Sequence, residues 1–220
     1  MDVDFSILWD YAPLFLRGAL NTLLITAVAG AIGVVLGLLL ALARLSGTRL
    51  LSWPAYAFIE FFRTTPPLIQ IVWAYFVIPV LVGFDITSFQ AACLALGLNT
   101  AAFLAEIFRA AILGVDGAQR DAATVLGLSR YAAHRHVILP QALRLALPAA
   151  TTNIMFLLKA TSLAAAIGTL ELMRVGQLVT TETFRPFEVL TFVSIIYFAM
   201  TYPIAALARR LEMRLALGRA

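Results

Sequence analysis

Polar and charged side chains inside otherwise apolar runs are the residues of this sequence that could do chemistry. Charges at membrane depth are costly, and they usually face a cavity or one another. Cationic side chains bind carboxylates, whereas hydroxyl and amide groups can donate or accept hydrogen bonds. The candidates of this kind are Arg63, Thr64, Thr65, Asn99, Lys159 and Ser162.

Two acidic residues in the same runs, Glu60 and Glu106, have a structural explanation. Each stands three residues before an arginine, Arg63 or Arg109, and residues at this spacing share one face of a helix. Pairs of this kind are weak signals of function. We therefore expect Glu106 and Arg109 to form a structural pair near one edge of the membrane.

The run Arg63-Thr64-Thr65-Pro66-Pro67 predicts a break within an apolar segment. Proline lacks the N–H that would continue a helix. Non-helical backbone at membrane depth is tolerated where it is buried in protein or lines a cavity. Broken helices supply binding groups in many transporters, so the hydroxyls of Thr64 and Thr65 are placed where they could serve a site.

The elements that must position these residues are membrane helices. The chain has 220 residues, of which 62% are hydrophobic and 13% charged, and its mean hydropathy is +0.93. Soluble domains are roughly half apolar and a quarter charged, so the composition indicates an all-α membrane protein. The single cysteine, Cys93, has no metal-ligand neighbours, which predicts no metal site.

Five segments are long and apolar enough to span a bilayer, which takes about 20 residues. We expect the second to start with Ser52 as a cap and Pro54 in its first turn. The whole chain is expected to form one transmembrane domain. The expected spans are 18–43, 54–82, 86–108, 145–170 and 189–208, with a polar loop over 111–144.

Arginines mark one side of these spans and are scarce on the other, which predicts orientation. The flanks opposite them hold an acidic N-terminus, a loop with only Asp85, and a loop in which acids offset two arginines. We therefore expect the N-terminus outside, the C-terminus in the cytoplasm and the 111–144 loop in the cytoplasm. The arginines of the cytoplasmic side are Arg44, Arg49, Arg109, Arg120, Arg130, Arg135, Arg144, Arg209, Arg210, Arg214 and Arg219.

Within the 111–144 loop the sequence predicts a helical hairpin, here named the 121–140 hairpin. Gln119–Leu126 favours a helix with Asp121 in its first turn, where a carboxylate meets the positive helix end. Gly127 is typical of a helix end with positive φ. Ser129 then caps a second helix, which Pro140 stops. Ala122 and Ala123 leave a low surface that another protein can approach.

Two ordinary explanations compete with a docking role for this hairpin. Any polar loop of this length folds some short helices. A DNA-binding helix-turn-helix is disfavoured, because tethering between two membrane spans prevents entry into a major groove.

The hairpin resembles the EAA loop of permeases in binding-protein-dependent ABC transporters. That motif reads EAA, three residues, G, nine residues, I, one residue, LP. This chain has Asp121-Ala122-Ala123, then Gly127, then Val137 and Leu139-Pro140 at the same spacing. Further segments are similar to the polar amino acid (histidine/glutamine/arginine/opine) subfamily: Ala43–Ser46, Ile59–Arg63 with Thr65-Pro66, Leu96–Asn99, Ala105–Ala110, Ile138–Arg144, Thr161–Leu163 and Phe184–Phe187.

The resemblance implies a transport subunit of the bacterial inner membrane that forms half of a translocation pathway. It implies two copies of a separate ABC ATPase, a second permease copy or paralogue, and an extracytoplasmic solute-binding protein. The sequence has no phosphate-binding G-x-x-x-x-G-K-[S/T] loop, so ATP and Mg are expected in the partner ATPase and no cofactor in this chain. The ATPase-coupling residues implied are Asp121, Ala122, Ala123, Gly127, Leu139 and Pro140.

An amino acid cargo is zwitterionic, so its carboxylate needs a cation and its ammonium needs acceptors. Lys159 or Arg63 suits the carboxylate, with Asn99, Thr65 and Ser162 as neutral partners. Relatives often read Lys-Asp-Thr-Ser-Leu where this chain has Lys159-Ala160-Thr161-Ser162-Leu163. The missing acid leaves open whether this subunit holds a complete pocket or a paralogue holds it.

Two other classes of function remain open from the sequence. A secondary transporter or channel would explain the hydrophobicity, but five spans are few for an inverted-repeat carrier. A membrane scaffold would explain neither the hairpin spacing nor the proline-broken second span. The amino acid carried, the stoichiometry, and the choice between homodimer and heterodimer are not specified by the sequence.

Overall fold

The structure, a computed structural model, describes residues 4–217, and within that range every regular element is a helix. The all-helical class predicted from composition is therefore confirmed. In chain order the elements are η1 Ser6–Trp9, α1 Ala12–Leu45, α2 Arg49–Thr64, α3 Pro67–Phe76, α4 Ile78–Val82, α5 Ser88–Leu113, α6 Gly117–Val125, α7 Arg130–Ala133, η2 His134–Ile138, α8 Leu139–Ala160, η3 Thr161–Ile167, α9 Leu172–Thr183 and α10 Pro186–Leu217.

Four helical stretches in the described part of the chain are long and apolar enough to cross a membrane. A fifth is added if the bent pair Arg49–Thr64 and Pro67–Val82, which turns by 106°, counts as one span. The four stretches are Ala12–Leu45, Ser88–Leu113, Tyr131–Ile167 and Pro186–Leu211. This composition supports a multi-pass membrane protein.

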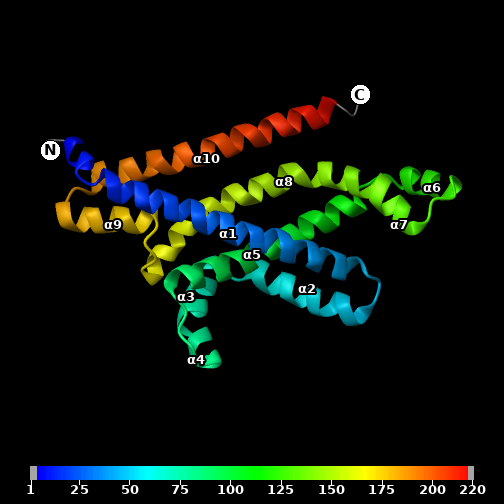
Figure 1. The fold of residues 1–220 in the computed structure, drawn as a ribbon, viewed down its shortest axis with the longest axis horizontal. Helices are drawn as coiled ribbons and strands as arrows, with labels where there is room; N and C mark the ends of the chain where they lie inside the picture. The colour runs from blue at the N-terminus through cyan, green and yellow to red at the C-terminus, as the bar shows by residue number, and fades with distance from the viewer. Residues whose placement is uncertain (1–3, 218–220) are drawn as a thin grey trace.

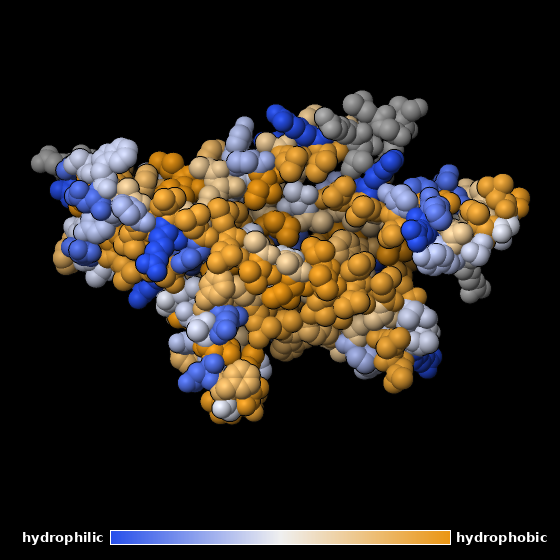
Figure 2. Space-filling view, viewed as in Figure 1, coloured by the Kyte–Doolittle hydropathy of each residue, from blue (hydrophilic) through white to orange (hydrophobic). Residues whose placement is uncertain are grey.

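The long helices α1, α5, α8 and α10 run along the long axis of the molecule (Figure 1). The turn between α1 and α2, the α6–α7 region and the C-terminal part of α10 lie toward one end. The N-terminal residues and α9 lie toward the other end. Figure 2 shows apolar residues over the middle of this face and polar residues collected mainly toward both ends, the pattern of a bundle that crosses a bilayer.

Helices α1 and α5 form the central pair, and glycines allow their close approach. A Cβ added to Gly33 would lie 2.5 Å from Thr100 Cγ2, and one added to Gly37 would lie 3.0 Å from the carbonyl oxygen of Ala101. Small residues at helix contacts are the usual means of close packing in membranes. Gly30 is less constrained, because its added Cβ would come no closer than 3.6 Å to a neighbour.

Helix α2 begins earlier than the sequence predicted. Thr48 occupies the N-cap position and Arg49 is the first residue of the helix, so Pro54 lies inside it. The expected cap at Ser52 is therefore wrong. Ser52 instead contacts the end of α1, where its hydroxyl accepts a hydrogen bond from Arg44 Nη1 at 3.1 Å. The break predicted from Pro66 and Pro67 is confirmed, since α2 ends at Thr64 and α3 starts at Pro67.

Pro140 does not stop a helix, contrary to the sequence prediction. Residues 134–138 form a π-helical turn, closed by Leu139 N–H donating to the carbonyl of His134. Pro140 is then the second residue of α8, where a missing N–H is tolerated, because the first turn of an α-helix has unpaired N–H groups. The helical stretch consequently continues from the hairpin into the bundle.

Helix α9 is fixed to the bundle by a buried acid. The Glu171 carboxylate caps α9 by accepting from the N–H groups of Met173 and Arg174 at 2.8 and 2.7 Å. It also accepts from Tyr197 Oη at 2.8 Å, which ties α9 to α10. The side chain is fully buried. This capping role was not predicted, because it depends on where α9 begins.

Candidate functional site

The break between α2 and α3 is closed by side chains from two helices. Pro66 has no N–H, so the carbonyl of Phe62 loses the partner that a continuous helix would give it. Asn99 Nδ2 of α5 donates to this oxygen at 2.8 Å, and Gln70 Nε2 of α3 donates to it at 3.0 Å. An orphaned carbonyl at membrane depth is thereby satisfied without water.

Gln70 binds the other groups at the break as well. Its Nε2 donates to the Thr65 carbonyl at 3.1 Å and to Thr65 Oγ1 at 2.7 Å, while its Oε1 accepts from Asn99 Nδ2 at 3.1 Å. Both amide side chains are buried. Gln70 is not among the predicted site residues, although a polar residue inside the apolar run Leu68–Val72 is a usable signal.

The two threonines before the prolines are held by their own helix. Thr64 Oγ1 donates to the carbonyl of Glu60 and Thr65 Oγ1 to that of Phe61, each at 2.7 Å. A hydroxyl has one proton to donate and two lone pairs. Both threonines can therefore accept a further hydrogen bond but have no proton left to give.

The polar residues of the fourth predicted span lie where α8 becomes η3. Lys159 is exposed in the last turn of α8, and Ser162 Oγ donates to its carbonyl at 2.8 Å. Ala160 is buried in the same apolar cluster as Ile71 and Ala74 of α3. The position of the missing acid thus lies against the helix that follows the break.

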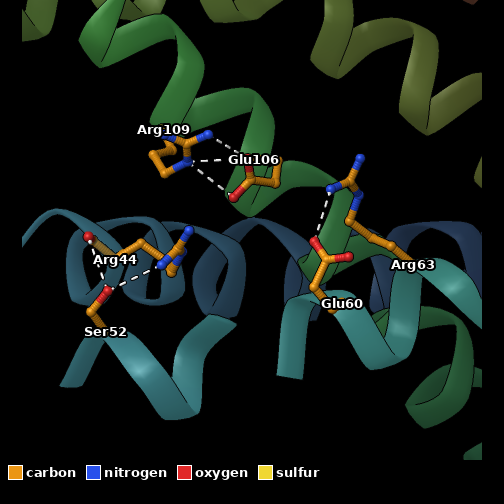
Figure 3. A network of polar contacts seen from close by, with 6 residues as sticks. All are labelled: Arg44, Ser52, Glu60, Arg63, Glu106 and Arg109. Carbon is orange, nitrogen blue, oxygen red and sulfur yellow. Dashed lines mark hydrogen bonds and ion pairs between the residues drawn. The ribbon is translucent and has the colours of Figure 1, made fainter. Parts of the chain in front are cut away.

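Charged residues gather on α1, α2 and α5 away from that cluster (Figure 3). Arg109 binds the Glu106 carboxylate through Nε and Nη2 at 2.8–3.1 Å. Arg63 Nη1 lies 3.6 Å from Glu60 Oε1. The structural pairs expected from the three-residue spacing are confirmed. Arg63 therefore has a partner on its own helix, although about a third of its side chain stays exposed.

The 121–140 hairpin has the local chemistry of two capped helices. Asp116 caps α6 by accepting from Ala118 N–H at 3.0 Å. Gly127 adopts φ +71° in a Schellman motif, with its N–H and that of Leu128 donating to Thr124 and Ala123. The Ser129 hydroxyl accepts from Ala132 N–H, which confirms the predicted cap.

The exposed surface of this hairpin differs from the one predicted. Asp121 is in the middle of α6 rather than in its first turn, because the helix begins at Gly117. Ala122 is exposed, but Ala123 is only 2% exposed, so it faces the protein's own core. Leu139 and Pro140 are exposed. Val125 and Leu126, which are not among the predicted residues, are 87% and 77% exposed.

Comparison with known proteins places this arrangement in a family. Residues 33–217 match the family described as "Binding-protein-dependent transport system inner membrane component". The chain is 38% identical over 216 residues to the glutamine transport system permease protein GlnP of Escherichia coli (strain K12), covering 98% of this chain and 99% of that protein. It is 34% identical over 215 residues to the arginine transport system permease protein ArtQ of Bacillus subtilis (strain 168), covering 98% of each.

Solved structures agree with the sequence matches. A crystal structure of an amino acid ABC transporter with histidines superposes with a TM-score of 0.91 at 37% identity, over 97% of this chain and 100% of that one. The inward-facing MetNI methionine ABC transporter superposes with a TM-score of 0.78 at 26% identity, over 94% and 98%. The resemblance drawn from the hairpin and its neighbouring segments is confirmed. The chain belongs to the family of binding-protein-dependent transport system inner membrane components, the membrane permease subunits of ABC importers.

Proposed function

We propose that this protein is the permease subunit of an ATP-driven importer of polar amino acids in a bacterial inner membrane. The single observation that carries the proposal is similarity over nearly the whole chain to permeases named for glutamine and arginine transport. The hairpin end faces the cytoplasm, because the arginine-rich flanks lie there. The N-terminus and α9 face outward.

The proposed complex contains two copies of an ABC ATPase, this permease with a second copy or paralogue, and an extracytoplasmic solute-binding protein. ATP and Mg are bound by the ATPase. The 121–140 hairpin docks on the ATPase through the exposed members of the coupling set, with Val125 and Leu126, while the buried Ala123 packs inside the protein. Because the hairpin continues into α8 as one helical stretch, movement of the ATPase is transmitted to the bundle.

The proposed substrate pathway runs past the α2–α3 break and the α8–η3 junction. Lys159 supplies a cation there, and Thr65 and Ser162 supply hydrogen-bonding groups. Asn99 is assigned to shape the break, because its amide nitrogen is already bonded to Phe62 and Gln70. Ala160 leaves this pocket without a carboxylate for the substrate ammonium, which favours a paralogous partner subunit that carries one.

Reconstitution tests the proposal. The chain is co-expressed with the ATPase and the binding protein that neighbouring genes encode. The purified complex is then placed in liposomes. Uptake of labelled glutamine, arginine and histidine is measured with ATP and Mg inside. ATP-dependent uptake of at least one of them is expected. Uptake by the isolated chain driven by an ion gradient would favour a secondary carrier, and absence of a co-purifying ATPase would favour a scaffold.

A further inference from the structure

A cavity with two charged residues in its lining lies where α2, α5 and α8 meet. Its volume is about 510 Å³. It is separate from the α8–η3 junction, because no residue from 157–167 lines it. The lining residues that matter are Arg63 of α2, Phe103, Glu106 and Ala110 of α5, and Leu145 and Ala149 of α8.

The cavity presents one cation and one anion from different helices. The Arg63 guanidinium lies over the Phe103 ring, 5.6 Å from its centroid, which directs it toward α5. Its contact with Glu60, at 3.6 Å, is longer than a hydrogen bond, so guanidinium donors remain available to a ligand. The Glu106 carboxylate is bound by Arg109, and about a fifth of the side chain is exposed. A carboxylate has about four acceptor sites, so Glu106 can accept from a further donor.

The two charged residues that line the cavity, Arg63 and Glu106, carry opposite signs. A pair of opposite charges attracts a free anion or a free cation less than a single charge would. It is complementary to a ligand that carries both signs. The small residues Ala110 and Ala149 leave room beside the two charges for a side chain.

We propose that this cavity is a second station for a free α-amino acid. Arg63 binds the α-carboxylate, and Glu106 binds the α-ammonium group. The proposal rests on the proposed function, because an importer of amino acids is what would bring a free amino acid into this cavity. It gives Arg63 and Glu106 a role apart from the Lys159 region.

The α8 wall of the cavity is linked to the hairpin. Leu145 packs in an apolar cluster with Ala111, Val115, Ile138 and Ala142, which joins the end of α5 to the start of α8. The cluster therefore connects the α8 wall of the cavity to the hairpin through Ile138.

The test measures protection of an introduced cysteine in the purified complex. Cys93→Ala removes the buried native thiol, and Ala110→Cys places a thiol in the cavity. L-Glutamine at about ten times its Kd for the cavity is expected to slow maleimide labelling of the introduced thiol about tenfold, because the occupied cavity excludes the reagent. Glutaramic acid, which lacks the ammonium group, and 4-aminobutanamide, which lacks the carboxylate, are expected to protect far less. Leu113→Cys, on an exposed site of α5 outside the cavity, is the control and should label equally with and without glutamine.

Charge variants assign the binding groups. Arg63→Gln and Glu106→Gln, each in the Ala110→Cys background, are expected to abolish protection. Arg63→Lys is expected to restore part of it, and Glu60→Gln to leave it intact. Protection that persists in both neutral variants would overturn the proposal. Protection by phosphatidylethanolamine without glutamine would assign the cavity to a zwitterionic lipid headgroup and also overturn it.

The two proposals fail in different ways. If the reconstituted complex imports glutamine while Ala110→Cys stays unprotected, only the second station is wrong. If the complex imports none of the amino acids tested and Ala110→Cys is not protected, the proposed function fails and the station fails with it.

Discussion

At the scale of single residues, one backbone oxygen explains why two buried amides lie at the α2–α3 break. The carbonyl of Phe62 loses its helical partner to Pro66 and gains Asn99 and Gln70 instead. A buried acceptor left without a donor costs about 1–3 kcal/mol, although hydrogen bonds between membrane helices average about 0.6 kcal/mol. The smaller figure applies here, because a membrane-embedded chain finds other donors when it unfolds.

Asn99→Leu and Gln70→Leu should each lower the free energy of unfolding by about 0.5–1 kcal/mol. Since both side chains bind the Phe62 carbonyl and each other, their effects should not add, and coupling of about 0.5 kcal/mol or more is expected. Denaturation in detergent of the two single variants and the double variant measures this. Strict additivity would contradict the shared-carbonyl explanation. Gln141→Leu, whose amide bonds only within its own helix, is the control.

Ala160 occupies the position where the family resemblance leads us to expect an acidic residue. Ala160→Asp should place a carboxylate beside Lys159 and lower the half-saturating amino acid concentration of stimulated ATPase activity. A gain of about 1.4 kcal/mol corresponds to a tenfold change. Ala160→Asn has a similar size without the charge and should leave the half-saturating concentration unchanged. Equal values for Ala160→Asp and the parent complex would show that the pocket does not use a carboxylate here.

At the scale of helices, two glycines of α1 differ in how closely their neighbours approach, since Gly33 faces α5 and Gly30 faces α8. Gly33→Ala forces a Cβ against the stiff β-branched Thr100, at 2.5 Å from Cγ2. Such overpacking costs about 1–3 kcal/mol. Gly30→Ala meets nothing closer than 3.6 Å and gains up to about 1 kcal/mol of helix propensity. Unfolding midpoints in detergent should therefore fall for Gly33→Ala and hold or rise for Gly30→Ala. A higher unfolding midpoint for Gly33→Ala than for Gly30→Ala would contradict the contact between Gly33 and Thr100.

The same scale shows what a sequence can and cannot predict. Gly127 and Ser129 were identified correctly, because positive φ and N-capping are decided by one residue and its immediate neighbours. The helix break at Pro66 was also predicted correctly, because it depends on the proline itself. The prediction that Pro140 stops a helix was wrong, because the residues before it form a π-helical turn instead of an α-helical one. Gln70 was detectable as a polar residue in an apolar run, but its partner Phe62 lies on another helix, so its role was not. The role of Glu171 likewise depends on contact with Tyr197 of α10.

At the scale of the whole molecule, the location of an exposed apolar side chain indicates whether lipid or a partner protein covers it. Most exposed apolar residues lie along the bundle, where a bilayer covers them. Val125 and Leu126 lie instead in the hairpin, at the end of the molecule where polar residues gather. A partner that buries them accounts for their exposure, and a separate ATPase is the partner proposed here.

Replacing both residues, as Val125→Ser with Leu126→Ser, should weaken the complex with the ATPase without altering membrane insertion. Burying each side chain contributes about 1.5–3 kcal/mol, so the double variant should lose at least about two powers of ten in affinity. Co-purification and ATP-driven uptake measure the loss. Leu50→Ser, at an equally exposed leucine at the start of α2, is the control and should retain both activities. A double variant that binds the ATPase normally would show that the coupling surface does not include Val125 and Leu126.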